Sequence, residues 1–282
     1  MARDVGLFGP STVTWRVHTD PALWIAGLRA LYLQALHPKV MRAAWQHSEF
    51  FNGDAWSRFV RTVNFVAIRT YGTNEQVERW GARVRRIHRQ LRAVDPDTGT
   101  EFRIDEPELL RWVHCAEIDS YLSVALRAGF PLTPEEADRY VDEQRRAASI
   151  VGLDPADVPG SAAELAAYYE RMRPELYASE EAKRALMVSF NPKLPLWLTP
   201  LKLAVPPANV LAFMMLPRWA RRMYGAPGLP TTDIAATAAI KALRRAALMV
   251  PPQLRDSPDV RRAKHLIREE QSPRNRHLRA VS

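Results

Sequence analysis

The sequence predicts an all-α protein, and three observations support this fold class. Apolar residues recur at steps of three and four through almost every periodic segment, which is the helical period. Capping residues, prolines and glycines separate these segments at spacings typical of helices. Only residues 94–105 have the pattern of a hairpin, because turn residues precede a short alternating run. With 282 residues, 47% of them hydrophobic, the chain can bury a sizeable core as a single domain.

Individual residues mark where the expected helices begin and end. Asp20 and Asp54 are expected to act as N-caps. Thr133 and Ser161 each open a helix as part of a capping box. Pro38 should divide the first helix, because proline cannot donate a backbone hydrogen bond. The expected helices cover residues 21–45, 55–71, 75–91, 107–128, 133–151, 161–172, 180–188 and 234–250.

Three segments depart from this regular pattern. Residues 190–217 are apolar and rich in proline, so we expect a packed irregular segment rather than a domain boundary. Residues 256–282 are basic and are expected to form a mobile tail. Residues 1–13 form an N-terminal arm, which leaves 14–255 as the helical domain.

The charge and the cysteine content limit the binding partners and the cellular compartment that the sequence predicts. The formal net charge of +9 suits nucleic acid, an anionic membrane surface or an acidic ligand. No compact basic run with interleaved aromatic residues occurs, so nucleic acid is not an expected partner. Cys115 is the one cysteine, which excludes an intrachain disulfide and paired-thiolate zinc sites. The chain has no signal-peptide pattern and no apolar run of about 18 residues, so we expect a cytoplasmic protein.

The familiar catalytic motifs are absent from the sequence. It contains no glycine-rich phosphate loop, no paired-histidine zinc helix and no nucleophile elbow. The Glu-x-x-His motif of di-iron bundles does not occur either. Any site must therefore be built from polar residues that lie on apolar helix faces.

His88 is the most informative of these residues. It lies on the apolar side of the helix expected over 75–91, beside Val84 and Leu91. Gly81 lies seven residues earlier, almost directly beneath His88, and its missing side chain is expected to leave room there. An imidazole that points into an apolar cavity with free space is what a haem iron needs. A core histidine would have the same spacing, so both interpretations stay open.

A second group of polar residues precedes His88. Arg58, Arg61 and Thr62 are three and four residues apart, so they share one helix face. Partly buried arginines usually form ion pairs, but such a group can also hold propionates, polarise bound oxygen or steady an intermediate. His114 lies three residues before Glu117 and is either a neighbour of a bound cofactor or a core histidine bonded to a carbonyl group.

Several strings, taken in order, resemble the MpaB-type oxygenases, the family that includes the rubber-cleaving latex-clearing proteins. The resemblance covers residues 14–255, nearly the whole chain, and several motifs in the right order make it specific. The matching strings are Trp24–Pro38, His47–Phe50, Arg58–Thr62, Val84–His88, Leu110–His114, Phe130–Thr133 and Gly160–Leu165.

This resemblance implies a globin-like helical core that binds haem b. His88 matches the proximal iron ligand, although the interval from Thr62 is a few residues shorter here, which keeps His114 as the alternative. Arg58 and Thr62 match polar residues that a functional haem site needs. Arg61 stands where the rubber enzymes carry a lysine, and a protonated arginine is a poor iron ligand, so we expect an open distal face. The nearest acidic candidates for a catalytic base are Glu49 and Asp54.

The sequence therefore predicts a haem-b oxygenase that combines dioxygen with a hydrophobic small molecule, with oxidative cleavage of a C=C bond as the reaction type that the resemblance implies. His88 would bind the iron, and Arg58, Arg61 and Thr62 would orient dioxygen or anchor propionates. The apolar segment 190–217 could line a channel or make peripheral contact with a membrane. The alternatives are a haem-binding or sensing protein without enzymatic activity and a cofactor-free helical protein with a basic tail.

Overall fold

The computed structural model describes residues 4–47, 55–190 and 203–272, with side chains from residue 60 onward in the second range. These residues are predominantly helical, which confirms the predicted fold class. The elements are α1 (Val13–His18), α2 (Leu23–Gln34), α3 (Pro38–His47), α5 (Ala55–Tyr71), α6 (Asn74–Gln90), β1 (Arg92–Val94), β2 (Glu101–Arg103), α7 (Pro107–Arg127), α8 (Pro134–Val151), η1 (Pro155–Asp157), α9 (Ala162–Met172), η2 (Arg173–Glu175), α10 (Glu180–Phe190), α11 (Val205–Met214), α12 (Arg218–Met223), α13 (Pro230–Met249), α14 (Pro252–Arg255) and α15 (Pro258–Gln271).

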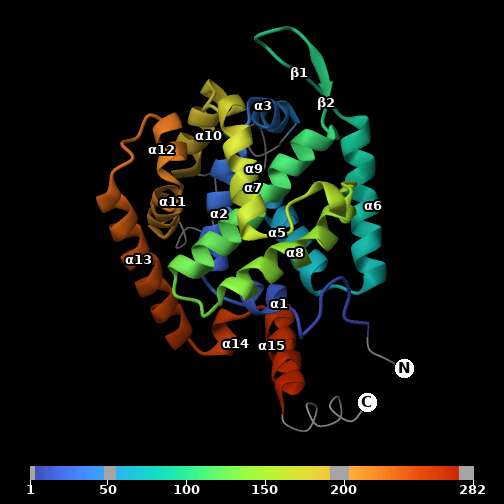
Figure 1. The fold of residues 1–282 in the computed structure, drawn as a ribbon, viewed down its shortest axis with the longest axis vertical. Coiled ribbons are helices and arrows are strands. Elements are labelled where there is room, and N and C mark those ends of the chain that lie inside the picture. The colour runs from blue at the N-terminus through green and yellow to red at the C-terminus, as the bar shows by residue number, and fades with distance from the viewer. Residues whose placement is uncertain (1–3, 48–54, 191–202, 273–282) are drawn as a thin grey trace.

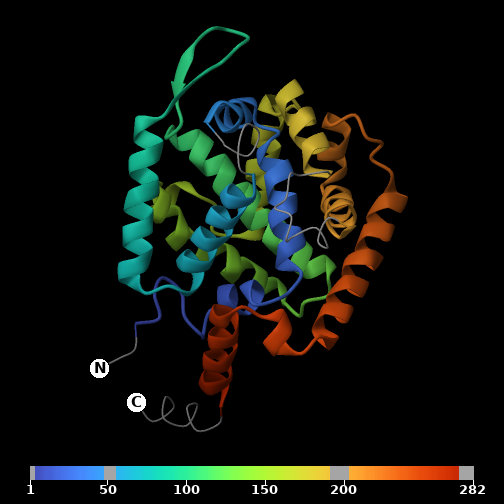
Figure 2. The ribbon, with the colours of Figure 1, turned by 180° about the vertical axis from the view of Figure 1, so that it is seen from behind.

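Helix α7 runs through the middle of the molecule, and the other helices surround it (Figure 1). α2 packs along α7, and α11 packs on α2. α6 and α13 lie at opposite sides, as the view from behind also shows (Figure 2). The antiparallel β1–β2 hairpin projects from one end, and α15 lies at the other. This hairpin joins the end of α6 to the start of α7. Helices α5 and α7 therefore run in the same direction, and α6, which lies between them in the sequence, runs in the opposite direction.

Local sequence explains most helix boundaries. Thr73 and Thr133 form capping boxes with the residues three positions later. Ser161 accepts a hydrogen bond from the Glu164 backbone N–H, as its predicted capping role requires. Gly152 ends α8 with a φ of 98°, a left-handed conformation that glycine adopts without steric cost. Pro38 separates α2 from α3, as predicted.

The main core forms around α7. Trp112, Cys115 and Val124 are completely buried, and Leu33 and Leu36 from the α2 side are equally inaccessible. A buried hydrogen-bond donor without a partner is costly. The Trp112 indole avoids this cost, because its Nε1 donates to the Gln34 carbonyl oxygen at 3.0 Å.

The structure corrects two of the segment predictions. Residues 205–214 form helix α11, so the expectation of an irregular segment over 190–217 is wrong there; residues 191–202 lie outside the described residues. The expected mobile tail includes α15, whose Ala263 is buried against α1 and α5. Both segments carry helical apolar periodicity that prolines obscured, since proline is tolerated in the first turn. Among the described helices, none combines the length and apolar character needed to span a membrane.

The predicted space at Gly81 does not exist. A Cβ atom built at Gly81 would lie 2.8 Å from Ile150 Cγ2 and 3.0 Å from the Ile150 carbonyl oxygen. The missing side chain lets α6 approach α8 closely, and α8 occupies the room that the sequence analysis predicted beside His88. The predicted apolar stripe is also less covered than expected, because Ile87 is 41% exposed.

This close approach predicts that Gly81→Ala destabilises the protein even though alanine is the better helix former. We expect the free energy of unfolding to fall by about 1–2 kcal/mol, measured by urea denaturation, because the new methyl group overpacks the contact with Ile150. Gly27→Ala in α2 is the matched control, since nothing lies within 4 Å of its added Cβ. That substitution should leave stability unchanged or raise it by up to about 1 kcal/mol. Equal effects at the two sites would contradict the packing argument.

Candidate functional site

A buried ion pair joins α5 to α7. The Arg69 guanidinium contacts both carboxylate oxygens of Glu117, with Nη1 3.2 Å from Oε2 and Nη2 hydrogen-bonded to Oε1. The side chains are 6% and 16% exposed. Burial alone would lower the pKa of Arg69, but the Glu117 carboxylate raises it overall. Burial alone would raise the pKa of Glu117, but Arg69 lowers it overall. Both groups therefore stay charged inside the protein.

His18 lies in the same buried cluster and is held by two hydrogen bonds. Its Nδ1 is 3.1 Å from the Thr70 Oγ1, and its Nε2 is 3.1 Å from the Tyr140 hydroxyl. Thr70 Oγ1 donates to the Val66 carbonyl oxygen at 2.8 Å, so it can only accept from His18. The network thus assigns the proton to Nδ1 and makes Nε2 an acceptor from Tyr140. Burial, aided by Arg69, lowers the pKa of His18 to about 3.

His114 lies one helical turn before Glu117 on α7. Its side chain is 6% exposed, and its Nε2 atom has no hydrogen-bond partner among the described residues. Burial, followed by the charge of Arg69, lowers the pKa of His114 to about 4. His114 is therefore a neutral imidazole with an available ring nitrogen, which is the state that a metal ligand requires.

The fold brings the sequence-predicted site residues to one end of three helices. Residues 58, 61 and 62 lie in the first half of α5, His88 lies in the last turn of α6, and His114 lies in the first half of α7. Each of these segments is at the end of its helix that is nearer the β1–β2 hairpin (Figure 2). Arg61 and Thr62 are exposed and His88 is half-buried.

The side chains of three predicted residues are not among those that the structure describes. The side chain of Arg58 lies outside the described residues, as do Glu49 and Asp54, the two candidates for a catalytic base. Within the described part of the chain, no group of three or more His, Cys, Asp or Glu residues could hold a bare metal ion. A single histidine ligand to a haem iron would not require such a group.

Sequence reasoning missed the charged centre of this cluster. Arg69 lies seven residues after Thr62 and therefore on the same helical face, which was the available signal. It was overlooked because its partner, Glu117, is 48 residues away in the sequence. Tyr121 belongs to the same cluster: its ring meets that of His18 edge-on at 5.1 Å, and burial, followed by the Glu117 carboxylate, raises its pKa.

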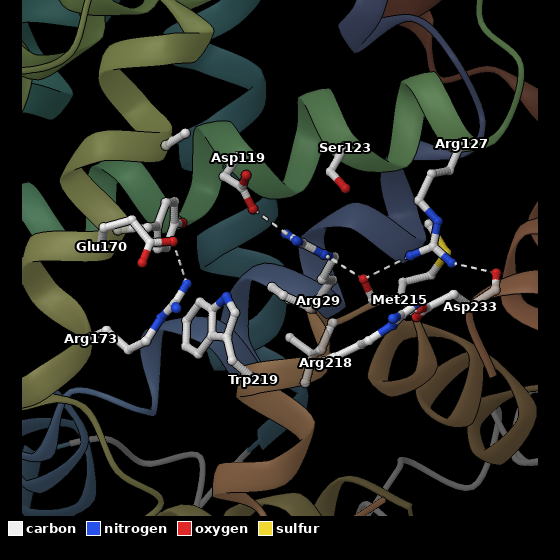
Figure 3. Close-up of a pocket in the computed structure, with 14 residues that line it drawn as sticks. Arg29, Asp119, Ser123, Arg127, Glu170, Arg173, Met215, Arg218, Trp219 and Asp233 are labelled. Atoms are coloured by element: carbon white, nitrogen blue, oxygen red, sulfur yellow. Dashed lines mark hydrogen bonds and ion pairs between the residues drawn. The ribbon is translucent and has the colours of Figure 1, made fainter. Parts of the chain in front are cut away.

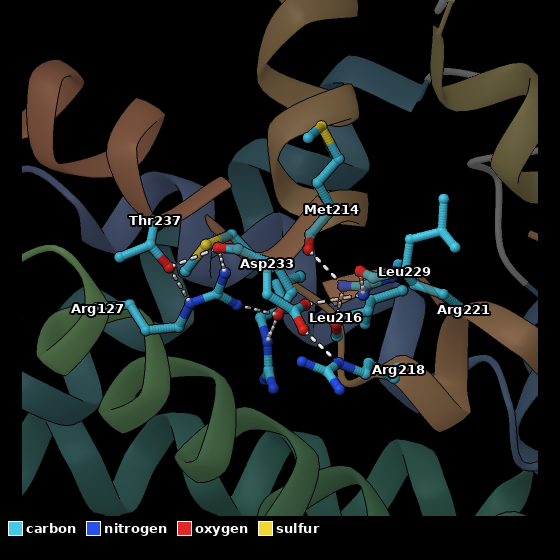
Figure 4. A network of polar contacts seen from close by, with 10 residues as sticks. Arg127, Met214, Leu216, Arg218, Arg221, Leu229, Asp233 and Thr237 are labelled. Atoms are coloured by element: carbon cyan, nitrogen blue, oxygen red, sulfur yellow. Dashed lines mark hydrogen bonds and ion pairs between the residues drawn. The ribbon is translucent and has the colours of Figure 1, made fainter. Parts of the chain in front are cut away.

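A second polar region lies on another face of α7. Asp119, Ser123 and Arg127 follow one another at four-residue steps and line a pocket of about 340 Å³ (Figure 3). Beside it, Asp233 accepts hydrogen bonds from Arg218 and Arg221 (Figure 4). The spacing separates this face from the one that carries His114, Glu117 and Tyr121.

Comparison with known families identifies the scaffold. A family model described as "ER-bound oxygenase mpaB/B'/Rubber oxygenase, catalytic domain" matches residues 15–250. The chain belongs to this oxygenase family. It is therefore an oxidoreductase of the oxygenase type, and the predicted family is confirmed. Neither a curated protein nor a solved structure matches the chain.

In this oxygenase, the Arg69–Glu117 pair should be a strong determinant of stability. Glu117→Gln leaves the Arg69 charge buried without a counter-ion, so we expect a loss of about 3 kcal/mol in the free energy of unfolding. The double variant Arg69→Met with Glu117→Leu should lose less than the sum of the losses in Arg69→Met alone and Glu117→Leu alone. Urea denaturation of the wild type, these two single variants and the double variant measures the coupling. The control is Glu75→Gln, which breaks the exposed pair Arg79–Glu75 and should cost no more than about 0.5 kcal/mol. Additive losses would contradict this interpretation.

The buried neutral histidines should make stability depend on pH. His18, His37 and His114 have pKa values lowered mainly by burial to about 3, about 4 and about 4, against 6.5 for an ordinary histidine. The unfolded chain therefore binds protons that the folded chain does not as the pH falls from 6.5 towards 4. Each histidine contributes full stability above pH 6.5 and loses about 1.4 kcal/mol for each pH unit below it.

His114→Leu should make the free energy of unfolding less dependent on pH, because the variant lacks one of the three buried histidines. Urea denaturation between pH 7 and pH 5 measures the slope, which should be shallower in the variant by about one proton equivalent. Leu254→Ala provides the control, since Leu254 is exposed and the substitution changes no titratable group, so the slope should stay unchanged. An unaltered slope in His114→Leu would show that the pKa of His114 is not lowered in the folded state.

Proposed function

We propose that this oxygenase uses haem b and acts with dioxygen on a hydrophobic small molecule, with oxidative cleavage of a C=C bond as the reaction class. The observation that supports the proposal is that His88, His114 and residues 58, 61 and 62 all lie toward the hairpin end of α5, α6 and α7, within a family match of 15–250. Bound haem would supply the iron centre for oxygen activation.

The residues present are compatible with a haem group. A proximal ligand must be a neutral imidazole with an available nitrogen, and a buried nitrogen without a partner needs something to bind. The Nε2 of His114 meets both conditions at the α7 wall. His88 lies in the last turn of α6, toward the same end of the molecule. We propose it as the iron ligand, with His114 as a cofactor-binding neighbour.

The remaining polar residues have distinct proposed roles. Arg58 and Arg61 would pair with the haem propionates or orient dioxygen, since guanidinium groups bind carboxylates through two donors. Thr62, one turn after Arg58, would add a hydroxyl group on the same face. Arg69 already neutralises Glu117, so its proposed role is to keep His18 and His114 unprotonated rather than to bind a propionate.

The hydrophobic substrate, a cytoplasmic location and peripheral contact with a membrane remain predictions. Exposed apolar side chains on α10 and α11, Met187 and Val210 among them, support an apolar substrate or surface near these helices. Oxygen consumption with unsaturated terpenoid and fatty-acyl compounds would test the substrate class.

Reconstitution with haem tests the cofactor and separates its two candidate ligands. The wild-type protein should bind one haem and show a Soret band, because a neutral histidine can occupy the axial position. His88→Ala should abolish or shift the band. His114→Ala should weaken haem binding while the axial signature in the spectrum is retained. His265→Ala is the control, since its exposed side chain lies on α15.

Each other outcome overturns a specific part of the proposal. A wild-type protein without a Soret band contradicts haem binding altogether. A lost axial signature in His114→Ala, with a normal spectrum in His88→Ala, moves the iron ligand from α6 to α7.

A further inference from the structure

The pocket on the opposite side of α7 is distinct from the haem end. It lies between α7, the α9–η2 segment and α12 (Figure 3). Its volume of about 340 Å³ falls at the lower end of the range for small-molecule sites. Its apolar wall includes Tyr169, Met215 and Trp219, and Ser123 and Arg218 supply polar groups.

In two of its arginines, every guanidinium nitrogen already contacts a protein group. Arg29, which is 2% exposed, donates from Nε to the Met215 carbonyl oxygen, from Nη1 to Ser120 and from Nη2 to Asp119. Arg127 likewise uses all three nitrogens, on Thr237 Oγ1 and on the Met215 and Asp233 carbonyl oxygens. Each of their guanidinium nitrogens thus contacts a protein group, so these arginines hold the pocket in shape and offer no unoccupied nitrogen to a ligand.

Arg218 differs from these two arginines. Its one hydrogen bond within the described residues runs from Nε to Asp233 Oδ2 at 2.5 Å, which leaves both Nη atoms available. Its side chain is half-exposed and lines the pocket. The Ser123 hydroxyl and the Trp219 indole N–H also have no hydrogen-bond partner in the described part of the chain, and both residues line the same pocket.

The charge of the pocket favours an anion. Four arginines and three carboxylates line it. Of the carboxylates, Asp233 is bound by Arg218 and by the buried Arg221, while Asp119 is bound by Arg29. Burial lowers the pKa of Arg127; Asp233 opposes this effect, and the positive charges of Arg29 and Arg221 reinforce it. Glu170 is bound by Arg173, so the four arginines exceed the three carboxylates by one positive charge.

We propose that this pocket binds a small carboxylate with a flat, apolar body. The carboxylate would take the two free Nη atoms of Arg218, whose planar fork matches two carboxylate oxygens. The body would lie against Trp219 and Met215. A phosphate ion could use the same donors but would leave this apolar wall without a contact. Because the pocket and the haem end lie on different faces of α7, this inference does not rest on haem binding.

Calorimetric titration of the full-length protein with benzoate, at constant ionic strength, tests the proposal. Inorganic phosphate and benzylamine are the comparison probes, because one lacks the apolar body and the other reverses the charge. We expect benzoate to bind more tightly than either probe. Arg218→Gln should weaken benzoate binding by about tenfold or more, as expected for loss of a charge-assisted pair.

Matched variants separate binding from folding. Arg245→Gln, at an exposed position on α13 away from the pocket, should leave benzoate affinity unchanged. Ser123→Ala removes one donor without touching the Arg218–Asp233 pair and should weaken binding by a few-fold, so it serves if Arg218→Gln fails to fold. The proposal is overturned if the wild-type protein does not bind benzoate at millimolar concentration, if Arg218→Gln and Arg245→Gln bind it equally, or if phosphate or benzylamine binds as tightly.

Discussion

Helix α7 can be buried along most of its length only because its carboxylates meet arginines from other helices. Glu117 pairs with Arg69 of α5, and Asp119 pairs with Arg29 of α2 at 2.8 Å. A buried charge without a counter-ion costs several kcal/mol, and the charges of Arg69, Glu117 and Arg29 are buried. Any other rotation of α7 would break both pairs at once, because the two carboxylates point to different sides of the helix. The positions of α5 and α2 around α7 therefore depend on these two contacts.

The two ion pairs also give the two sides of α7 different chemical surroundings. On the α5 side, burial, aided by the charge of Arg69, lowers the pKa values of His18 and His114 and keeps both imidazoles neutral, which suits groups that donate a lone pair or relay a proton. On the α2 side, Arg29 binds the Asp119 carboxylate, the Ser120 hydroxyl group and the Met215 carbonyl group. The pocket that these contacts support is lined by more arginines than carboxylates. One face of α7 thus carries a buried ion pair beside uncharged histidines, and the other borders a pocket with an excess of positive charge.

Most of the fold could be predicted from the sequence because helix periodicity and capping are local. Thr133 and Pro38 act as expected, since their effects depend on a few neighbouring residues. The tertiary consequences were harder to predict. Gly81 has the same sequence pattern whether it borders a cavity or packs on α8, and only the fold distinguishes the two. The set of predicted site residues gathers at one end of three helices, whereas Arg69 was missed because its role is fixed by a distant carboxylate.

Helix α15 shows that the folding unit is longer than the family's catalytic domain. The family match ends at residue 250, but Ala263 completes a hydrophobic cluster with Trp15 and Tyr71. Arg262 Nη2 donates to the Tyr71 carbonyl oxygen at 2.5 Å, and Trp15 Nε1 donates to that of Thr70 at 2.8 Å. Arg262 and Ala263, which lie beyond the family match, thus stabilise the end of α5 on which Arg69 of the charged cluster lies. A chain shortened to the family boundary would keep every proposed haem residue and lose the contacts that hold the end of α5 on which Arg69 lies.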